Sequence, residues 1–176
     1  MPLNKTSLIY YVGTLLSTAL LLSCDNKTGF GYSNTQSDVT FDILEDLNPP
    51  ENFKILALGD SYTIGQSVCI NCRFPEQLKD SLIVNFDPQD TFSLEIIAQT
   101  GWTTTNLISA IATSNPSSDH NLVTLLIGVN NQYQGKPFAL YETEFITLVN
   151  TAIALAGDDS SNLIVVSIPD YAYTPF

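Results

Sequence analysis

Four short apolar runs, beginning at Phe53, alternate along the chain with stretches whose apolar residues recur at helical spacing. The runs lie at 53–58, 91–98, 122–127 and 163–168, and the helical stretches lie at 74–85, 103–112 and 140–156. Continuously apolar strands are typical of a sheet buried on both faces, and alternation with helices makes neighbouring strands parallel. The pattern predicts an α/β fold, a three-layer α/β/α sandwich around a flavodoxin-like parallel sheet.

The amino terminus carries a separate signal. Lys5 precedes an apolar run at 8–22, which is short for a membrane span and ends in Ser23 and Cys24. The segment resembles a bacterial lipoprotein signal peptide, with Leu21 to Cys24 as its lipobox. That resemblance implies removal of residues 1–23, acylation of Cys24, and a lipid anchor in the bacterial cell envelope, on a membrane face toward the periplasm or the outside. An uncleaved membrane anchor and a plain secretory signal are the alternatives.

Between this signal and the first apolar run, the chain is rich in Asn, Thr, Ser, Asp and Gly and closes with Pro49 and Pro50. Such a composition is typical of a flexible tether. We therefore predict three parts: a signal peptide at 1–23, an acylated cysteine with its tether at 24–52, and one folded domain at 53–176.

Charge and histidine content restrict the function. Six Lys and Arg residues stand against 18 Asp and Glu residues, for a net charge of −12, whereas nucleic-acid binding needs a basic surface. The one histidine, His120, excludes any multi-histidine metal site. We expect no nucleic-acid partner, no metal and no cofactor. A flavodoxin-like cofactor binder is a weaker alternative, because the chain has no glycine-rich phosphate loop.

Polar and small residues follow three of the predicted strands where each one ends. They occupy positions 59–62, 99–102 and 128–131, with the sequences Gly-Asp-Ser-Tyr, Gln-Thr-Gly-Trp and Gly-Val-Asn-Asn. Function in an open parallel sheet lies at the carboxyl ends of the strands. We therefore expect the three loops to meet at one edge of the sheet and to form the site there.

These three loops resemble the conserved blocks of the SGNH, or GDSL-type, serine hydrolases. The first block spans Ile55 to Gly65 with Ser61 at the nucleophile position, Gly101 matches the glycine of the second block, and Asn130 matches the asparagine of the third. The third block usually reads Gly-x-Asn-Asp, so Asn131 departs from it. The resemblance implies hydrolysis of a small-molecule ester through an acyl-enzyme, with Ser61 as the nucleophile.

The resemblance also implies an oxyanion hole. Its donors would be the backbone N–H groups of Ser61 and Gly101 and the side-chain amide of Asn130. Attack on an ester places negative charge on the carbonyl oxygen, and one pre-aimed donor can stabilise that charge by about 3 kcal/mol. Gly101 would let the backbone approach closely because it lacks a Cβ atom. Asp60 is expected to shape the turn rather than to act in the chemistry.

The family's catalytic base, in a carboxyl-terminal Asp-x-x-His block, has no match here. His120 precedes the third strand, so it should lie at the opposite edge of the sheet from Ser61, and we interpret it as a solvated loop histidine. We therefore predict an incomplete sheet of about four strands, lacking its last strand and helix, with little activity as given. The alternative is a non-catalytic cell-envelope binding or scaffold lipoprotein of the same fold.

The sequence leaves the roles of two further pairs of residues open. Cys69 and Cys72 are predicted to form a local disulfide or to stay reduced with a structural effect, because two thiols and one distant histidine do not make a zinc site. A thioredoxin-like redox pair is disfavoured, since that motif directly follows a strand. Tyr62 and Trp102 could wall a pocket or simply pack at the sheet edge.

Overall fold

The computed structural model describes residues 49–169; residues 1–48 and 170–176 are not described. The predictions for the signal peptide, for Cys24 and for most of the tether therefore lie outside the described residues. Residues from Pro49 onward form a compact unit of their own. Its first strand begins at Asn52, one residue inside the predicted tether, because Asn52 already pairs with Thr91 in the sheet.

The sheet has four strands, all parallel, in the order β2-β1-β3-β4. Their bounds are Asn52–Gly59 for β1, Thr91–Ala98 for β2, Leu122–Leu126 for β3 and Leu163–Val165 for β4. The prediction of a parallel sheet is confirmed. Because β1 lies between β2 and β3, the loops that leave these three strands emerge side by side.

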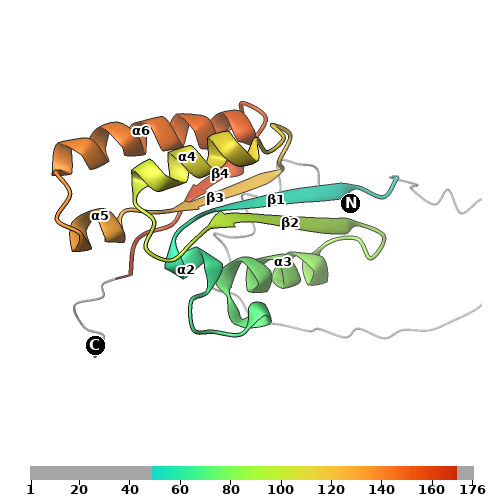
Figure 1. The fold of residues 1–176 in the computed structure, drawn as a ribbon. Coiled ribbons are helices and arrows are strands. Elements are labelled where there is room, and N and C mark those ends of the chain that lie inside the picture. The colour runs from blue at the N-terminus through green and yellow to red at the C-terminus, as the bar shows by residue number, and fades with distance from the viewer. Residues whose placement is uncertain (1–48, 170–176) are drawn as a thin grey trace, which may run out of the picture. The chain divides into compact units, whose positions relative to one another are not determined.

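Helices cover both faces of the sheet, which confirms the three-layer arrangement (Figure 1). One face carries α2 (Ser61–Ile64) and α3 (Phe74–Asn85), and the other carries α4 (Thr104–Ser114) and α6 (Phe138–Leu155). The short α5 (Val129–Tyr133) lies beyond the end of β3. Two single 3₁₀ turns, η2 (Ile70–Cys72) and η3 (Ser160–Asn162), complete the connections.

The main hydrophobic core lies between the sheet and the helices α4 and α6. Alternate residues of a strand point to opposite faces, so Leu56 and Leu58 of β1 face this layer. They pack in one cluster with buried residues of β3, α4 and α6, among them Val123, Leu125, Leu107, Ile111, Leu148 and Ala152. This continuous core fixes α4 and α6 against the strands whose ends carry the candidate site.

The last described strand is shorter than predicted. The apolar run reaches residue 168, but β4 ends at Val165, which pairs with Leu125. Its partner β3 ends at Leu126, and one further backbone hydrogen bond, from the Val166 N–H to the Leu125 carbonyl at 2.9 Å, follows the end of β4. Ile164 and Val165 are exposed by 37% and 50%.

Two short helices, α2 and α5, were not predicted, because one turn of helix is too short to show a periodic pattern. Among residues 49–169, only α6 is long and apolar enough to cross a membrane by length and composition, a test that a core helix of a soluble protein also passes. Its contacts with α4 and β3 belong to the layer described above.

Candidate functional site

The strand register brings the three predicted loops to one edge of the sheet. Gly59, at the end of β1, pairs with Ala98 of β2 on one side and with Leu126 of β3 on the other. Ser61, Gly101 and Asn130 lie two, three and four residues beyond these paired positions. The carboxyl ends of β1, β2 and β3 lie side by side (Figure 1), so the register places all three candidate residues at that edge of the sheet.

Ser61 is the first residue of α2, and the residues around it are dictated by a sharp turn from strand to helix. A Cβ atom at Gly59 would lie 2.5 Å from the Leu126 carbonyl oxygen, so only glycine fits between β3 and α2. Asp60 caps the helix, since its Oδ1 accepts a hydrogen bond from the Tyr62 N–H at 3.1 Å. Gly65 ends the helix in a left-handed conformation, with φ of 75°.

Asp60 directly precedes the candidate nucleophile in the chain and is fully buried. Burial raises the pKa of Asp60 to about 6, against the lowering effect of the backbone hydrogen bond from Tyr62. Its second oxygen, Oδ2, has no hydrogen-bond partner within the part of the chain that the structure describes. Asp60 thus bonds to the turn through one oxygen only.

Gly101 lies in a turn between β2 and α4 with φ of 84°, a conformation that favours glycine. Apart from its own two chain neighbours, no atom of residues 49–169 lies within 4 Å of where its Cβ would stand. The positive φ accounts for glycine at this position, and the expected close approach of the backbone to a substrate oxygen stays a prediction. The Gly101 carbonyl accepts a hydrogen bond from the Gln134 Nε2 at 3.0 Å.

Gly128 lies two residues before Asn130. The backbone turns there with φ of 131°, and a Cβ at Gly128 would lie 2.6 Å from Tyr141 Cε2. The half-buried Asn130 side chain donates from Nδ2 to the Trp102 carbonyl at 2.9 Å. An amide nitrogen carries two hydrogens, so this contact leaves one N–H for another acceptor. Trp102 itself packs against the core cluster, which favours packing over a pocket wall.

Three side chains hold the turn at 101–104, and none of them was assigned this role from the sequence. Gln134 and Asn130 bond to the carbonyl groups of Gly101 and Trp102, and the buried Asn131 bonds to Thr104. The two loops that contain Gly101 and Asn130 are thus fixed to each other by consecutive contacts. The departure of Asn131 from the family pattern was the one sequence signal that pointed to this position.

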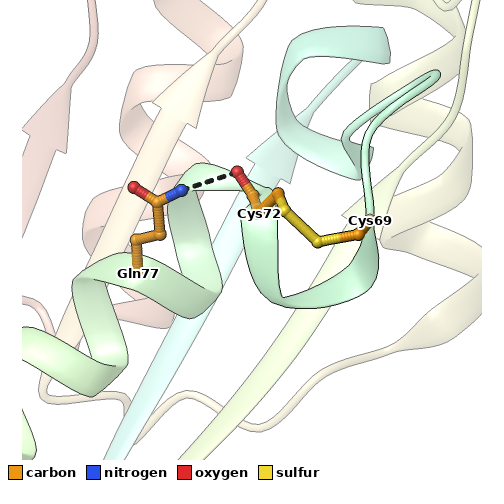
Figure 2. Close-up of a disulfide and its surroundings, with 3 residues drawn as sticks. All are labelled: Cys69, Cys72 and Gln77. Atoms are coloured by element: carbon orange, nitrogen blue, oxygen red, sulfur yellow. Dashed lines mark hydrogen bonds between the residues drawn. A yellow bond between two sulfur atoms is a disulfide. The ribbon is translucent and has the colours of Figure 1, made fainter.

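A second link joins the Gly101 loop to the loop after α2. The Thr100 hydroxyl donates to Gln66 Oε1 at 2.6 Å. The loop after α2 also contains an exposed disulfide between Cys69 and Cys72, which closes the turn η2 (Figure 2). Gln77 of α3 donates to the Cys72 carbonyl at 2.7 Å and connects the turn to that helix. Among residues 49–169, no group of three His, Cys, Asp or Glu side chains is placed to hold a metal ion.

The interpretation of His120 as a solvated loop residue is wrong, since its side chain is 4% exposed. Its Nδ1 lies 3.1 Å from the Leu155 carbonyl oxygen at the end of α6, and its backbone N–H donates to the same oxygen. Its Nε2 lies 3.8 Å from Glu95 Oε2. The sequence could not show this contact, because Leu155 is 35 residues away.

The predicted position of His120 at the opposite edge agrees with the structure. The next residue, Asn121, donates its N–H to the carbonyl of Lys54, near the amino end of β1. An open hollow of about 250 Å³ lies at this edge, lined by Lys54, Ile55, Ser93, Leu94, Glu95, Ser117 and His120. Ser61 follows the other end of the same strand, so His120 and Ser61 do not meet.

No protein-family model and no curated protein matches this sequence. Among solved structures, the chain is similar to the crystal structure of TesA, at 18% identity and a TM-score of 0.51, over 69% of this chain and 64% of that one. It is also similar to AlinE4, an SGNH-hydrolase family esterase, at 18% identity and a TM-score of 0.54, over 66% of this chain and 59% of that one. The match spans about three fifths of each solved chain. This chain therefore has the fold of the SGNH hydrolases.

Proposed function

We propose that the site catalyses attack on a small-molecule ester by Ser61. The observation that carries the proposal is the shared register of three strands, which places the Gly-Asp-Ser turn, Gly101 and Asn130 at one edge. The Asn130 contact with the Trp102 carbonyl then fixes two of the loops to each other. The similar esterase AlinE4 supports this class of reaction, and the proposal extends it to this chain.

In the proposed reaction, the Ser61 hydroxyl oxygen bonds to the ester carbonyl carbon while its proton passes to a base. The carbonyl oxygen becomes an oxyanion, which accepts hydrogen bonds from the backbone N–H groups of Ser61 and Gly101 and from the free Asn130 N–H. Collapse of this intermediate breaks the bond to the alcohol, which takes the proton back, and leaves an acyl group on Ser61. Water then releases the acyl group by the same steps.

The base is the component that this sequence does not supply at the site. His120 lies beside Lys54, and Gly59 is five positions further along the strand, a span of roughly 17 Å. Proton transfer needs contact within about 3 Å. We propose that a longer parent protein provides the base and that the chain as given has little turnover, because a serine hydroxyl without a base is a weak nucleophile.

Chemical rescue tests the nucleophile on this chain. Added imidazole should act as the missing base and acetylate Ser61 from p-nitrophenyl acetate, with one acetyl group located on the Ser61 peptide by mass spectrometry. Imidazole also reacts with the ester directly, so Ser61→Ala provides the background. His120→Ala is the matched control and should acetylate like the parent. If parent and Ser61→Ala acquire the same label, the serine mechanism is wrong and the non-catalytic envelope protein is the better proposal.

The oxyanion role of Asn130 has a separate expected result. Asn130→Ala should slow imidazole-dependent acetylation by about 10²–10³-fold, the range seen for the loss of one oxyanion donor. Gln132, an exposed neighbour on α5, gives the control Gln132→Ala, which should leave the rate unchanged. Equal rates in the two variants would remove Asn130 from the proposed site.

The proposed location is the bacterial cell envelope, with lipid on Cys24. The support is the lipobox-like segment that ends at Cys24. Growth with an alkyne-bearing fatty acid should label the full chain, and Cys24→Ala should abolish that label. Labelling that survives Cys24→Ala would contradict the lipid anchor without bearing on the serine chemistry.

A further inference from the structure

We infer that Glu144 of α6 is a positioning residue for the candidate oxyanion donors, and that it is matched to the asparagine at position 131. Glu144 lies outside all three loops of the candidate site. It acts through Thr104 and Asn131, so it touches neither the substrate nor the reacting atoms. The hydrogen bonds among Glu144, Thr104 and Asn131 belong to the fold and do not depend on the proposed function. Only their role in positioning oxyanion donors rests on the proposed function.

The orientation of the Asn131 amide follows from one fixed donor. The Thr104 backbone N–H can only donate, and it lies 3.0 Å from Asn131 Oδ1. The amide nitrogen, Nδ2, must then face the Thr104 hydroxyl, at 2.7 Å. Both residues are buried, with 3% of Asn131 and none of Thr104 exposed. The Thr104 hydroxyl oxygen therefore accepts from Asn131.

The proton of the Thr104 hydroxyl is left to donate elsewhere, and it donates to Glu144 Oε2. The other Glu144 oxygen, Oε1, accepts from the Thr105 hydroxyl at 2.7 Å. The Thr105 hydroxyl also lies 2.9 Å from Oε2, so it bonds to both oxygens of the carboxylate. The chain of contacts runs in one direction, from Asn131 through Thr104 to Glu144. A carboxylate at its end is an acceptor only, which suits this direction.

This direction explains why position 131 is not the aspartate of the family pattern. An aspartate there would still accept from the Thr104 N–H, but its second oxygen would face the Thr104 hydroxyl oxygen without a proton between them. Two carboxylates, of Asp at 131 and of Glu144, would then compete for the one hydroxyl proton, and one carboxylate oxygen would be left without a donor. Asn131 and Glu144 thus form a matched pair across α5 and α6.

The pair bears on the candidate donors because Asn131 directly follows Asn130. Asn130 binds the Trp102 carbonyl and Asn131 binds Thr104, so the two side chains together fix α5 against the turn that presents Gly101. A shift of Thr104 would move both candidate donors relative to Ser61. Loss of the Glu144 contact should therefore disturb the site from a distance.

A double-mutant cycle tests the match in the full chain. N131D should lower the melting temperature at pH 8 by about 5–10 °C, as expected for a buried polar group left unpaired. E144Q alone should cost about 2 °C, because a glutamine oxygen still accepts from Thr104. N131D/E144Q should return to within about 3 °C of the parent, since the glutamine amide can donate to the Thr104 oxygen and free its proton for the aspartate.

The matched control is Glu142, an exposed residue of α6 with the same side chain. N131D/E142Q should remain as unstable as N131D, because Glu142→Gln removes a charge without contacting Thr104. Rescue by E142Q would show a general charge effect, and absence of rescue by E144Q would show no match; either result overturns the inference.

Acetylation of Ser61 in imidazole adds a readout that a purely structural role would not move. At a temperature where all variants are folded, N131D should acetylate about 10-fold more slowly than the parent, and N131D/E144Q should recover to within about threefold. Unchanged acetylation in folded N131D would overturn the positioning role. No acetylation in the parent would instead defeat the proposed function, and the melting temperatures would still decide whether Asn131 and Glu144 are matched.

Discussion

The two ends of β1 carry buried polar side chains in contrasting surroundings. At the carboxyl end, side chains of α5 and of Gln134, the residue after it, hold a turn in which Gly101 has a positive φ. At the amino end, the His120 ring is buried against the Leu155 carbonyl, and Lys54 pairs with Asp119 at 2.6 Å. The histidine, which is the usual catalytic base, serves the packing of α6 here, while a glycine and an amide form the candidate site. Residue type alone therefore does not locate the chemistry.

The largest expected effect tests how tightly the carboxyl end is built. Gly59→Ala would place a Cβ 2.5 Å from the Leu126 backbone oxygen, which cannot rotate away as a side chain could. We expect a loss of about 4 kcal/mol in the free energy of unfolding, measured with urea, or failure to fold. Gly135→Ala is the matched control, since its Cβ would meet no atom within 4 Å and only its φ of 64° is unfavourable, at about 1 kcal/mol. Equal losses in the two variants would contradict the tight packing at Gly59.

A middle-sized effect concerns the pH dependence at the same end. The pKa of Asp60 is raised from 3.8 to about 6, so the folded state holds this proton more tightly than the unfolded state. The resulting stability is fully present below pH 4 and is lost as the pH rises through 6, by at most about 3 kcal/mol. Asp60→Asn should remove this part of the slope in urea unfolding between pH 4 and 7, whereas Asp158→Asn, at an exposed turn, should keep it. If the pH dependence of the unfolding free energy persists in Asp60→Asn, another group causes it.

The smallest effect lies at the amino end and has the opposite sign. The Lys54 ammonium, hydrogen-bonded to Asp119, lowers the pKa of Asp119 to about 2. The contribution is present above pH 4 and is lost as the pH falls through 2. Because Asp119 is exposed, salt should screen the pair, and Asp119→Asn should change the melting temperature at pH 7 less than either variant above. A change as large as that of Gly59→Ala would show that the two ends are equally rigid.

Local patterns in the sequence predicted most of the fold. The apolar run that begins at Phe53 predicted the central strand, and the short motif around Ser61 predicted a turn at its end. What the sequence could not predict depends on partners far along the chain. His120 is buried against a carbonyl 35 residues away, and Thr104 meets Glu144 40 residues away. The helices α2 and α5 were missed because they are too short for a periodic signal.

The contacts between α5 and the turn at 101–104 also set an order of events during synthesis. The contacting residues are 27, 28 and 33 positions apart, so the ribosome must add β3 and α5 before the turn can acquire them. A nascent chain that ends before Gly128 has Ser61, Gly101 and the link from Thr100 to Gln66, but it lacks the three side chains that bond to the turn at 101–104. Since closing such loops carries an entropic cost before any contact forms, the candidate site should be one of the last parts of this sheet to order. Pulse-labelled hydrogen exchange should therefore protect the amides of β1 and β2 before those of the turn at 101–104.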